Sequence, residues 1–385
     1  TGRKFILMKK KIVIIGSGIA GLTAANLLKT NSNFDVMVYE KEKILSLEEG
    51  YGIQLAPNGI SILNKIGFSN IVSNDLFNPS KLNFYSVNDN KICNLNLTRF
   101  NTNAAKYTTL KRSTLIEFLK DNLFENNIRF GKEIKKVSKV KEKLLINFAD
   151  GTNDLADFII VSDGVFSRTK SIIENKTTKP VYNGSIAIRK IIKLSEGFNY
   201  ESENISLIMF PNAHIVIYPI NKKNELNLVC IVRQKSFLNK NIHSIIEKEI
   251  LSQNKSLGNL FKGRLESWPI YTTTKPSKSV YENLFYLGDS FYTFLPTMAQ
   301  GASQSIEGAE ELFNLLSEDG KGIQDLYFKK RLRRTKLVDN RSKLNYFSFH
   351  LSSPLMVKIR NTILKKATKS EKILDRYIGD IYQAI

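Results

Sequence analysis

The chain has 385 residues, 42% of them hydrophobic, which is enough for two domains or for one large domain with an insertion. Its two cysteines are too few for a disulfide framework or a zinc site, and no apolar run approaches the ~20 residues of a membrane-spanning helix, so we expect a cytoplasmic protein without a metal. The formal net charge of +21 could attract nucleic acid, anionic lipid or an acidic substrate, but no nucleic-acid-binding signature accompanies it and we expect no nucleic-acid partner.

A glycine-rich loop follows the first predicted strand. Residues 12–15 are typical of a buried strand, and a helical pattern starts at Leu22. Between them, Gly16 allows the tight turn, Gly18 lets a pyrophosphate approach the backbone, and Gly21 lets the helix pack closely on the strand. The free N–H groups at the helix start favour phosphate. The loop therefore predicts a dinucleotide site, which also includes Ile19 and Ala20.

The second predicted strand, residues 35–39, ends in an acidic residue. Glu40 follows Gly21 by 19 residues, which is where an acidic side chain accepts hydrogen bonds from the adenosine ribose of a dinucleotide. We assign the neighbouring Lys41 to the same site. The order strand, glycines, helix, strand and acid supports a dinucleotide site far better than the glycines do alone.

The middle of the chain mixes helices with short strands. Residues 82–97 alternate between apolar and polar side chains, as in a hairpin or a small sheet. Residues 108–122 have the apolar spacing of a helix, with Arg112 near its start. Another buried strand ends at Val161 and is followed by Ser162-Asp163-Gly164, so a second strand carries an acid at its end.

Residues 181–233 interrupt the alternation of strands and helices. They contain four predicted strands, which we interpret as an antiparallel sheet that forms a second domain. The alternation resumes at residues 283–287, a strand that ends in Gly288 and Asp289. A helix and then a basic helical tail follow.

A dinucleotide needs anchor points beyond the glycine loop. Asp289 follows the third acid-tipped strand, where a carboxylate can bind the hydroxyls of a ribityl chain. Gln300, Gly301 and Ala302 precede a helix, so their amides could face the pyrimidine end of a flavin. That end becomes negative on reduction, and a helix N-terminus stabilises negative charge.

Together these motifs resemble those of the class A FAD-dependent aromatic hydroxylases, which are single-component flavin monooxygenases. The resemblance covers about residues 8–345 and rests on three fingerprints in the order of the family. They are Gly16-x-Gly18-x-x-Gly21, Ser162-Asp163-Gly164, and Gly288-Asp289 with Pro296 and Ala299-Gln300-Gly301-Ala302. The resemblance implies an α/β fold: a Rossmann-like FAD-binding domain of the GR2 type, an inserted antiparallel β-sheet substrate domain and a C-terminal helical tail.

The resemblance also implies a cofactor and roles for single residues. It implies FAD, with NAD(P)H as co-substrate; Glu40 would bind ribose, Arg112 would contact FAD, and Asp289 would bind the ribityl or pyrophosphate region. Asp163 and Gly164 belong to the fingerprint linked to both FAD and NAD(P)H. The alternative is that Arg112 is a plain residue of a helix surface. The other cofactor-binding positions are Gly16, Gly18, Gly21, Gly288, Pro296, Gly301 and Ala302.

A narrower resemblance lies in the predicted second domain. His214-Ile-Val-Ile-Tyr218-Pro219 is similar to a segment of the 3-hydroxybenzoate 6-hydroxylase, salicylate hydroxylase and 6-hydroxynicotinate monooxygenase group. Positions four apart in a strand face the same side, so both side chains can line one pocket. The resemblance implies that His214 accepts a phenolic proton and Tyr218 orients the substrate, whereas a satisfied core histidine is the plainer alternative. It also places Arg189 and Gln300 near the substrate.

The chain departs from the family pattern at two positions. Tyr292 stands where the family usually has a histidine, and Gly308 stands where it usually has an aspartate. We assign Tyr292 to the substrate site. Its neighbours Phe291 and Phe294 make this region apolar, so a substrate larger and more hydrophobic than a benzoate is an alternative.

We therefore expect an enzyme, an NAD(P)H-dependent flavoprotein monooxygenase. In the family, NAD(P)H reduces FAD, O2 adds to give the flavin C4a-hydroperoxide, and its distal oxygen is transferred to an aromatic, phenolic ring. Carboxylate-bearing phenols are the first expectation, because Arg189 and the basic field could attract an anion. Two alternatives remain: a hydroxylase of a lipophilic quinone precursor or polyketide, and a non-catalytic FAD-binding redox protein.

The expected domain division has four parts. Residues 8–180 form the first part of the FAD-binding domain, with a small sheet insertion near 80–100, and residues 181–275 form the substrate-binding β-sheet domain. Residues 276–345 complete the FAD-binding domain, and residues 346–385 form a basic helical tail. We expect the tail to pack on the FAD-binding domain, and peripheral contact with the inner membrane surface is the alternative. The sequence leaves the oligomeric state open.

Overall fold

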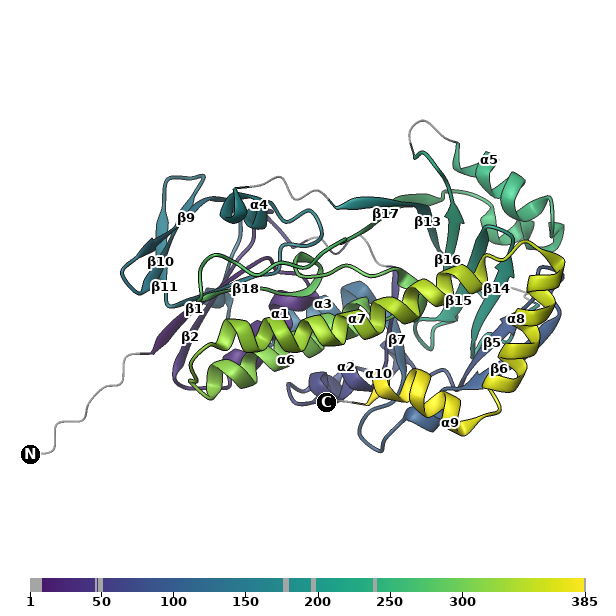
Figure 1. The fold of residues 1–385 in the computed structure, drawn as a ribbon, viewed down its shortest axis with the longest axis horizontal. Helices are drawn as coiled ribbons and strands as arrows, with labels where there is room; N and C mark the ends of the chain where they lie inside the picture. The colour runs from purple at the N-terminus through teal and green to yellow at the C-terminus, as the bar shows by residue number, and fades with distance from the viewer. Residues whose placement is uncertain are drawn as a thin grey trace, which may run out of the picture.

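A five-stranded parallel sheet, in the order β18-β12-β1-β2-β8, forms one end of the molecule in the computed structural model (Figure 1). The structure describes residues 9–45, 47, 51–175, 180–194, 199–237 and 241–383; residue 8, where the first expected domain begins, lies outside them. The strands are β1 (Lys10–Ile15), β2 (Phe34–Tyr39), β8 (Ile128–Arg129), β12 (Phe158–Val161) and β18 (Leu284–Tyr286). The predicted Rossmann-like sheet is thereby confirmed.

Both faces of the parallel sheet are covered, and β1 shows why. Ile12 and Ile14 pack against helices on one side, whereas Val13 and Ile15 pack against a three-stranded sheet on the other. The helices are α1 (Ile19–Leu28), α2 (Pro57–Asn64), α3 (Arg112–Asp121) and α6 (Gly301–Ser317). The covering strands are β9 (Ile134–Val140), β10 (Lys143–Phe148) and β11 (Asn153–Ala156), and α4 (Arg168–Glu174) follows β12.

A seven-stranded sheet forms the other end of the molecule, in the order β17-β13-β16-β15-β14-β5-β6. Its neighbouring strands pair antiparallel, as predicted, except that β14 and β5 run parallel. One face packs on α5 (Ile242–Ile246) and on a helical segment at 255–261. The strands are β5 (Lys81–Tyr85), β6 (Lys91–Asn96), β13 (Val181–Lys193), β14 (Ile205–Phe210), β15 (Ala213–Pro219), β16 (Glu225–Arg233) and β17 (Glu266–Thr272).

Two segments differ from the sequence-based expectation. The strands expected near 80–100 are β5 and β6, but they extend the seven-stranded sheet because β5 pairs with β14. The helix expected from Thr108 begins only at Arg112, because residues 108–111 form β7. This strand pairs with β3 (Gly52–Leu55) and β4 (Leu76–Phe77) in a small sheet between the two ends. Two β-branched threonines at its start favour the extended backbone.

The tail is helical, as predicted, and it contacts both ends of the molecule. α7 (Ile323–Phe349) packs along α6 and reaches β15, where its last turn meets the seven-stranded sheet. α8 (Pro354–Ala367) begins at a proline, which is compatible with the first turn of a helix, and packs beside β6. α9 (Glu371–Leu374) and α10 (Asp380–Tyr382) follow α8 and lead back toward the first domain (Figure 1). α7 therefore packs on the first domain as expected, α10 also contacts α2, and α8 lies on the second sheet instead.

Within the described ranges, each helix is too short or too polar to cross a membrane. The four-part division of the chain into 8–180, 181–275, 276–345 and 346–385 remains a proposal. The two large sheets support the first three parts, and α8 shows that the last part is packed against the second sheet.

Candidate functional site

The loop between β1 and α1 forms a cradle of backbone atoms, because Gly16, Gly18 and Gly21 have no side chains. A Cβ on Gly16, whose φ is +101°, would lie 2.7 Å from the Ser162 carbonyl oxygen, and one on Gly21 would lie 2.1 Å from the Gly16 oxygen. A Cβ on Gly18 would meet no atom within 4 Å, so this residue borders open space at the helix start. The first turn of α1, which contains Ile19 and Ala20, has no acidic residue that would repel an anion. These features fit a pyrophosphate.

Glu40 lies directly beside this loop, at the end of β2. Its Oε2 accepts hydrogen bonds from the Ser17 backbone N–H at 2.8 Å and from the Ser17 hydroxyl at 2.9 Å. The carboxylate is therefore placed where a ribose next to the pyrophosphate would extend. Lys41 differs, because its side chain is exposed and its Nζ lies 3.6 Å from Glu42.

Gly288, of the third predicted fingerprint, packs against Ala20 in the glycine loop of the first. Gly288, with a φ of +67°, has no room for a side chain, because a Cβ there would lie 2.8 Å from that of Ala20. Asp289 follows and opens into the large cavity described below. Desolvation by the surrounding protein raises the pKa of its carboxyl group to about 6, and the positive charge of Arg112, the first residue of α3, lowers it. The two residues are thus close enough to act on one ligand.

Asp163 performs a local structural task. Its Oδ2 accepts a hydrogen bond of 3.1 Å from the Thr169 backbone N–H at the start of α4, and Gly164 has a φ of +87°. Its Oδ1 is buried, with no hydrogen-bond partner among the residues that the structure describes. One carboxylate oxygen therefore remains for a ligand.

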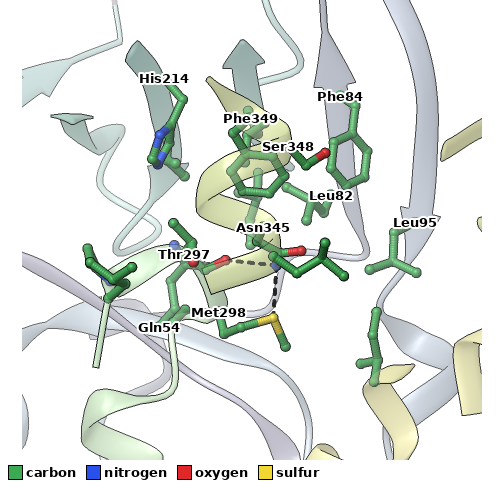
Figure 2. Close-up of a pocket in the computed structure, with 18 of the residues that line it drawn as sticks. Gln54, Leu82, Phe84, Leu95, His214, Thr297, Met298, Asn345, Ser348 and Phe349 are labelled. Carbon is green, nitrogen blue, oxygen red and sulfur yellow. Dashed lines mark hydrogen bonds between the residues drawn. The ribbon is translucent and has the colours of Figure 1, made fainter. Parts of the chain in front are cut away.

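A cavity of about 790 Å³ lies between the two ends of the molecule. Figure 2 shows His214 on one side of it and Leu82, Phe84 and Leu95 on the other. Residues expected to bind the cofactor line the same cavity: Asp289, Pro296, Gly301 and Ala302. So do three of the residues expected to bind the substrate: Arg189, His214 and Tyr218. The fold therefore brings the two predicted groups together.

His214 is hydrogen-bonded to a second histidine. Only 1% of its surface is exposed, and its Nδ1 lies 2.7 Å from Nε2 of His350, at the C-terminal end of α7. Burial lowers the pKa of His214 to about 3 and is also the main cause that lowers the pKa of His350 to about 2, so both rings are neutral at neutral pH. The sequence analysis did not identify His350. The one available signal was that the chain has three histidines.

Tyr218 and Arg189 complete the polar part of the cavity. Burial raises the pKa of Tyr218, and its hydroxyl lies beside Gln54 and Asn227. The Arg189 guanidinium stacks near Tyr51 and Trp268, with its carbon 5.9 Å and 5.7 Å from the ring centroids.

Two expected substrate residues lie elsewhere. Gln300 does not line the cavity; its side-chain oxygen accepts hydrogen bonds of 3.2 Å from Asn58 and 3.1 Å from Gln304. The Tyr292 ring packs 5.1 Å from that of Phe294 and borders a separate small void. Burial and the carboxylate of Asp339 on α7 raise the pKa of Tyr292, so its hydroxyl stays protonated. The structure does not bring either residue to His214.

The tail explains the second departure from the family pattern. A Cβ on Gly308 would lie 3.0 Å from Leu287 and 3.4 Å from Nε of Arg331, so there is little room for a side chain at this position. The neighbouring Glu307 pairs with Arg334 at 2.6 Å, and both are buried. α7 is therefore bound to α6 by a buried ionic cluster.

Comparisons with known proteins agree with this geometry. The family model described as an NAD(P)-binding Rossmann-like domain matches residues 14–48. The chain is 23% identical over 382 residues to 3-amino-4-hydroxybenzoate 2-monooxygenase PtnB3 of Streptomyces platensis, which covers 94% of each protein. It is 25% identical over 347 residues to 6-hydroxynicotinate 3-monooxygenase of Pseudomonas fluorescens, covering 83% of this chain and 85% of the relative.

Among solved structures, Klebsiella pneumoniae HpxO complexed with FAD and uric acid has the same fold. The TM-score is 0.84 at 17% identity, covering 97% of this chain and 96% of that one. The predicted resemblance to the FAD-dependent aromatic hydroxylases and the predicted fold class are thereby confirmed.

Proposed function

We propose that this protein is an FAD-dependent monooxygenase that hydroxylates an aromatic ring with NAD(P)H and O2. The observation that carries the proposal is the single cavity that Asp289, Pro296 and Gly301 share with His214 and Tyr218. The relatives that cover most of the chain are named as monooxygenases of ring compounds, a hydroxybenzoate and a hydroxynicotinate, which supports the same reaction.

The residues around the glycine loop fit FAD. Gly16, Gly18 and the α1 N-terminus would hold the pyrophosphate, and Glu40 would hold the ribose. Asp289, Arg112 and the start of α6 would hold the flavin end. Bound there, FAD would supply the redox and oxygen-transfer chemistry, while the protein orients the substrate and excludes water.

His214 is our candidate for the base that takes the phenolic proton. Its Nδ1 is used by His350, so Nε2 is the nitrogen left for a ligand in the cavity. The low pKa keeps the ring neutral and leaves a lone pair on Nε2, but it also makes the ring a weak base in the absence of a ligand charge. An imidazolium formed beside a phenolate is one of a pair of opposite charges, which offsets the cost of charge in a buried site. Tyr218 on the same strand would orient the ring.

The hydrogen bond to His350 decides whether His214 can act in this way. Nε2 of His214 is free to accept only if its Nδ1–H donates to His350 Nε2. His350 then carries its own proton on Nδ1, which is buried without a partner in the described part of the chain. In the opposite tautomer, His350 donates, and His214 presents an N–H that would bind a phenolate or carbonyl oxygen. His350 is thus a positioning residue.

The first test is anaerobic reduction of the bound FAD by NADH and by NADPH, with and without a panel of phenolic acids, quinone precursors and polyketide-like phenols, followed by admission of O2 and analysis of the products. A ligand that strongly accelerates reduction and yields a hydroxylated product supports the proposal. A protein that takes up no FAD overturns it. Reduction without any product favours the alternative of a non-catalytic redox protein.

Peripheral membrane contact and a cytoplasmic location also remain proposals. α8 exposes apolar residues, among them Leu355 and Ile363, next to the exposed Lys358 and Lys365. Co-sedimentation with anionic liposomes at low salt tests this contact, and protein that stays in the supernatant removes it.

A further inference from the structure

Arg360, in the middle of α8, is a buried cation that lines the cavity. Only 6% of its surface is exposed, and desolvation lowers its pKa. Among the described residues, no carboxylate lies within ion-pair distance of it. A buried charge without a counter-ion is costly, so the position calls for an explanation.

Neutral acceptors satisfy only part of the guanidinium. Nε and one Nη2–H donate to the side-chain oxygen of Asn361 at 3.0 and 2.9 Å, and one Nη1–H donates to the Ser348 carbonyl at 3.3 Å. The bond to Ser348 helps to close the C-terminal end of α7, which is a structural role. Two of the five N–H groups have no acceptor in the described ranges. They are available to an anion.

The rest of this helix face is apolar and also lines the cavity. Met356, Ile359, Ile363, Leu364 and Ala367 share the face with Arg360, at helical spacing. Leu82 and Phe84 of β5 and Leu95 of β6, the strand beside α8, line the same cavity (Figure 2). Ile359 and Ile363 are nevertheless 44% and 59% exposed, although both line the cavity. An apolar group of a ligand would cover them.

We infer that the substrate is an anionic aromatic compound with an apolar extension: its ring lies at His214, its apolar part lies against α8, β5 and β6, and its carboxylate or similar anion binds Arg360. This assignment rests on the proposed function and narrows its substrate class. It also combines the two properties, anionic and lipophilic, that the sequence analysis left as alternatives.

Arg189 is the weaker candidate for the anion site. It lies opposite Glu266 in the pairing of β13 and β17, and two aromatic rings face its guanidinium. The two rings partly compensate the charge of Arg189, although Glu266 pairs with Arg264 and Arg189 Nε is buried without a hydrogen-bond partner among the described residues; no aromatic ring faces the Arg360 guanidinium there. A ligand anion gains more at the uncompensated cation.

Calorimetry on the purified holoprotein tests the inference directly. The probes are 2-hydroxybenzoates with ring alkyl chains of increasing length, the matching alkylphenols and the methyl esters. We expect the acids to bind about tenfold or more tightly than the phenols and esters, and affinity to rise about two- to fourfold per methylene. Arg360→Gln, which keeps a donor for Ser348, is expected to remove the preference for the acid and to leave phenol binding unchanged.

Lys358→Gln is the matched control, because it removes the same charge from an exposed position of the same helix outside the cavity lining. It should leave the preference intact. Acid binding that Arg360→Gln does not weaken, no preference for acids in the native protein, no gain with chain length, or no binding of any probe would each overturn the inference. A protein that binds the alkyl acids through Arg360 but yields no hydroxylated product would instead overturn the proposed function and leave this inference standing.

Discussion

His214 Nδ1 lies 2.7 Å from His350 Nε2, although 136 residues separate the two in the chain. The strand residue that the motif suggested is thus oriented by the end of a helix in the tail. The hydrogen bond joins the substrate side of the cavity to α7, which is itself bound to the first domain through Glu307 and Arg334. A disturbance of the tail therefore reaches the proposed base directly.

The first prediction concerns this hydrogen bond. His350→Leu removes the acceptor for the Nδ1–H of His214, so we expect hydroxylation to fall by about ten- to a hundredfold. His350→Gln supplies an amide oxygen that can accept the same proton and should recover much of the loss. The measurement is product formed per NAD(P)H oxidised, over a range of pH.

The control is the melting temperature of the two variants. If it is equal, a difference between their hydroxylation rates comes from the positioning of His214 and not from stability. If Leu and Gln at position 350 give equal rates and equal pH profiles, His350 has no positioning role and only fills space.

The second prediction is that acid destabilises the protein through the histidine pair. An unfolded chain binds a proton on each ring below about pH 6.5, whereas the folded protein keeps the rings neutral until about 3 and 2. The unfolded state therefore binds more protons as the pH falls. The free energy of unfolding should decrease by up to about 1.4 kcal/mol per pH unit for each histidine.

Urea unfolding between about pH 8 and pH 4 measures this slope. The variant with leucine at both positions 214 and 350 is the reference, because its carboxylates are those of the native chain. Equal slopes for the two proteins would mean that the pair already carries a proton in the folded state.

The third prediction concerns Gly18 and distinguishes an effect on FAD binding from an effect on folding. Gly18→Ala should leave the melting temperature of the apoprotein unchanged, because the new Cβ meets no protein atom within 4 Å, yet it should weaken FAD binding by about tenfold or more. Gly258→Ala is the control, since its Cβ also meets nothing and it lies far along the chain from the loop. FAD binding that is equally strong in both variants would place the pyrophosphate elsewhere. Flavin fluorescence during titration reports the affinity.

The fourth prediction concerns the buried ionic cluster. Arg334→Met leaves Glu307 buried without its closest cation, so we expect a loss of about 3–5 kcal/mol in the free energy of unfolding. Lys278→Met breaks the exposed pair with Asp325 and should cost less than about 1 kcal/mol. A loss at position 334 as small as that at 278 would show that the cluster contributes little. Denaturant unfolding gives both values.

The sequence motifs correctly predicted those elements whose structure depends on neighbouring residues. The glycine loop and the strand that leads to Glu40 are fixed by neighbours in the sequence, and the structure has the expected strand, turn and helix there. Residues 108–111 were expected to be helical because Leu110 continues the apolar spacing of the helix that follows, whereas the two threonines and pairing with the distant β3 and β4 favour a strand.

Long-range packing could not be predicted. Nothing local to β5 shows that it adds to β14, and nothing local to His350 or Arg360 shows that they reach one cavity. The lack of space at Gly308 likewise depends on Arg331 of α7, whose Nε would lie 3.4 Å from a Cβ there. In each case the information lies in a partner from another part of the chain.

The cavity wall made by residues 344–378 has a consequence for biosynthesis. These residues leave the ribosome after both sheets have been translated. A nascent chain can therefore form its glycine loop while the cavity is still open to water. The cavity gains this wall, and His214 forms its hydrogen bond with His350, only in the last stage of folding. A chain that ended before residue 344 would lack this wall, and the cavity would be open to water on that side.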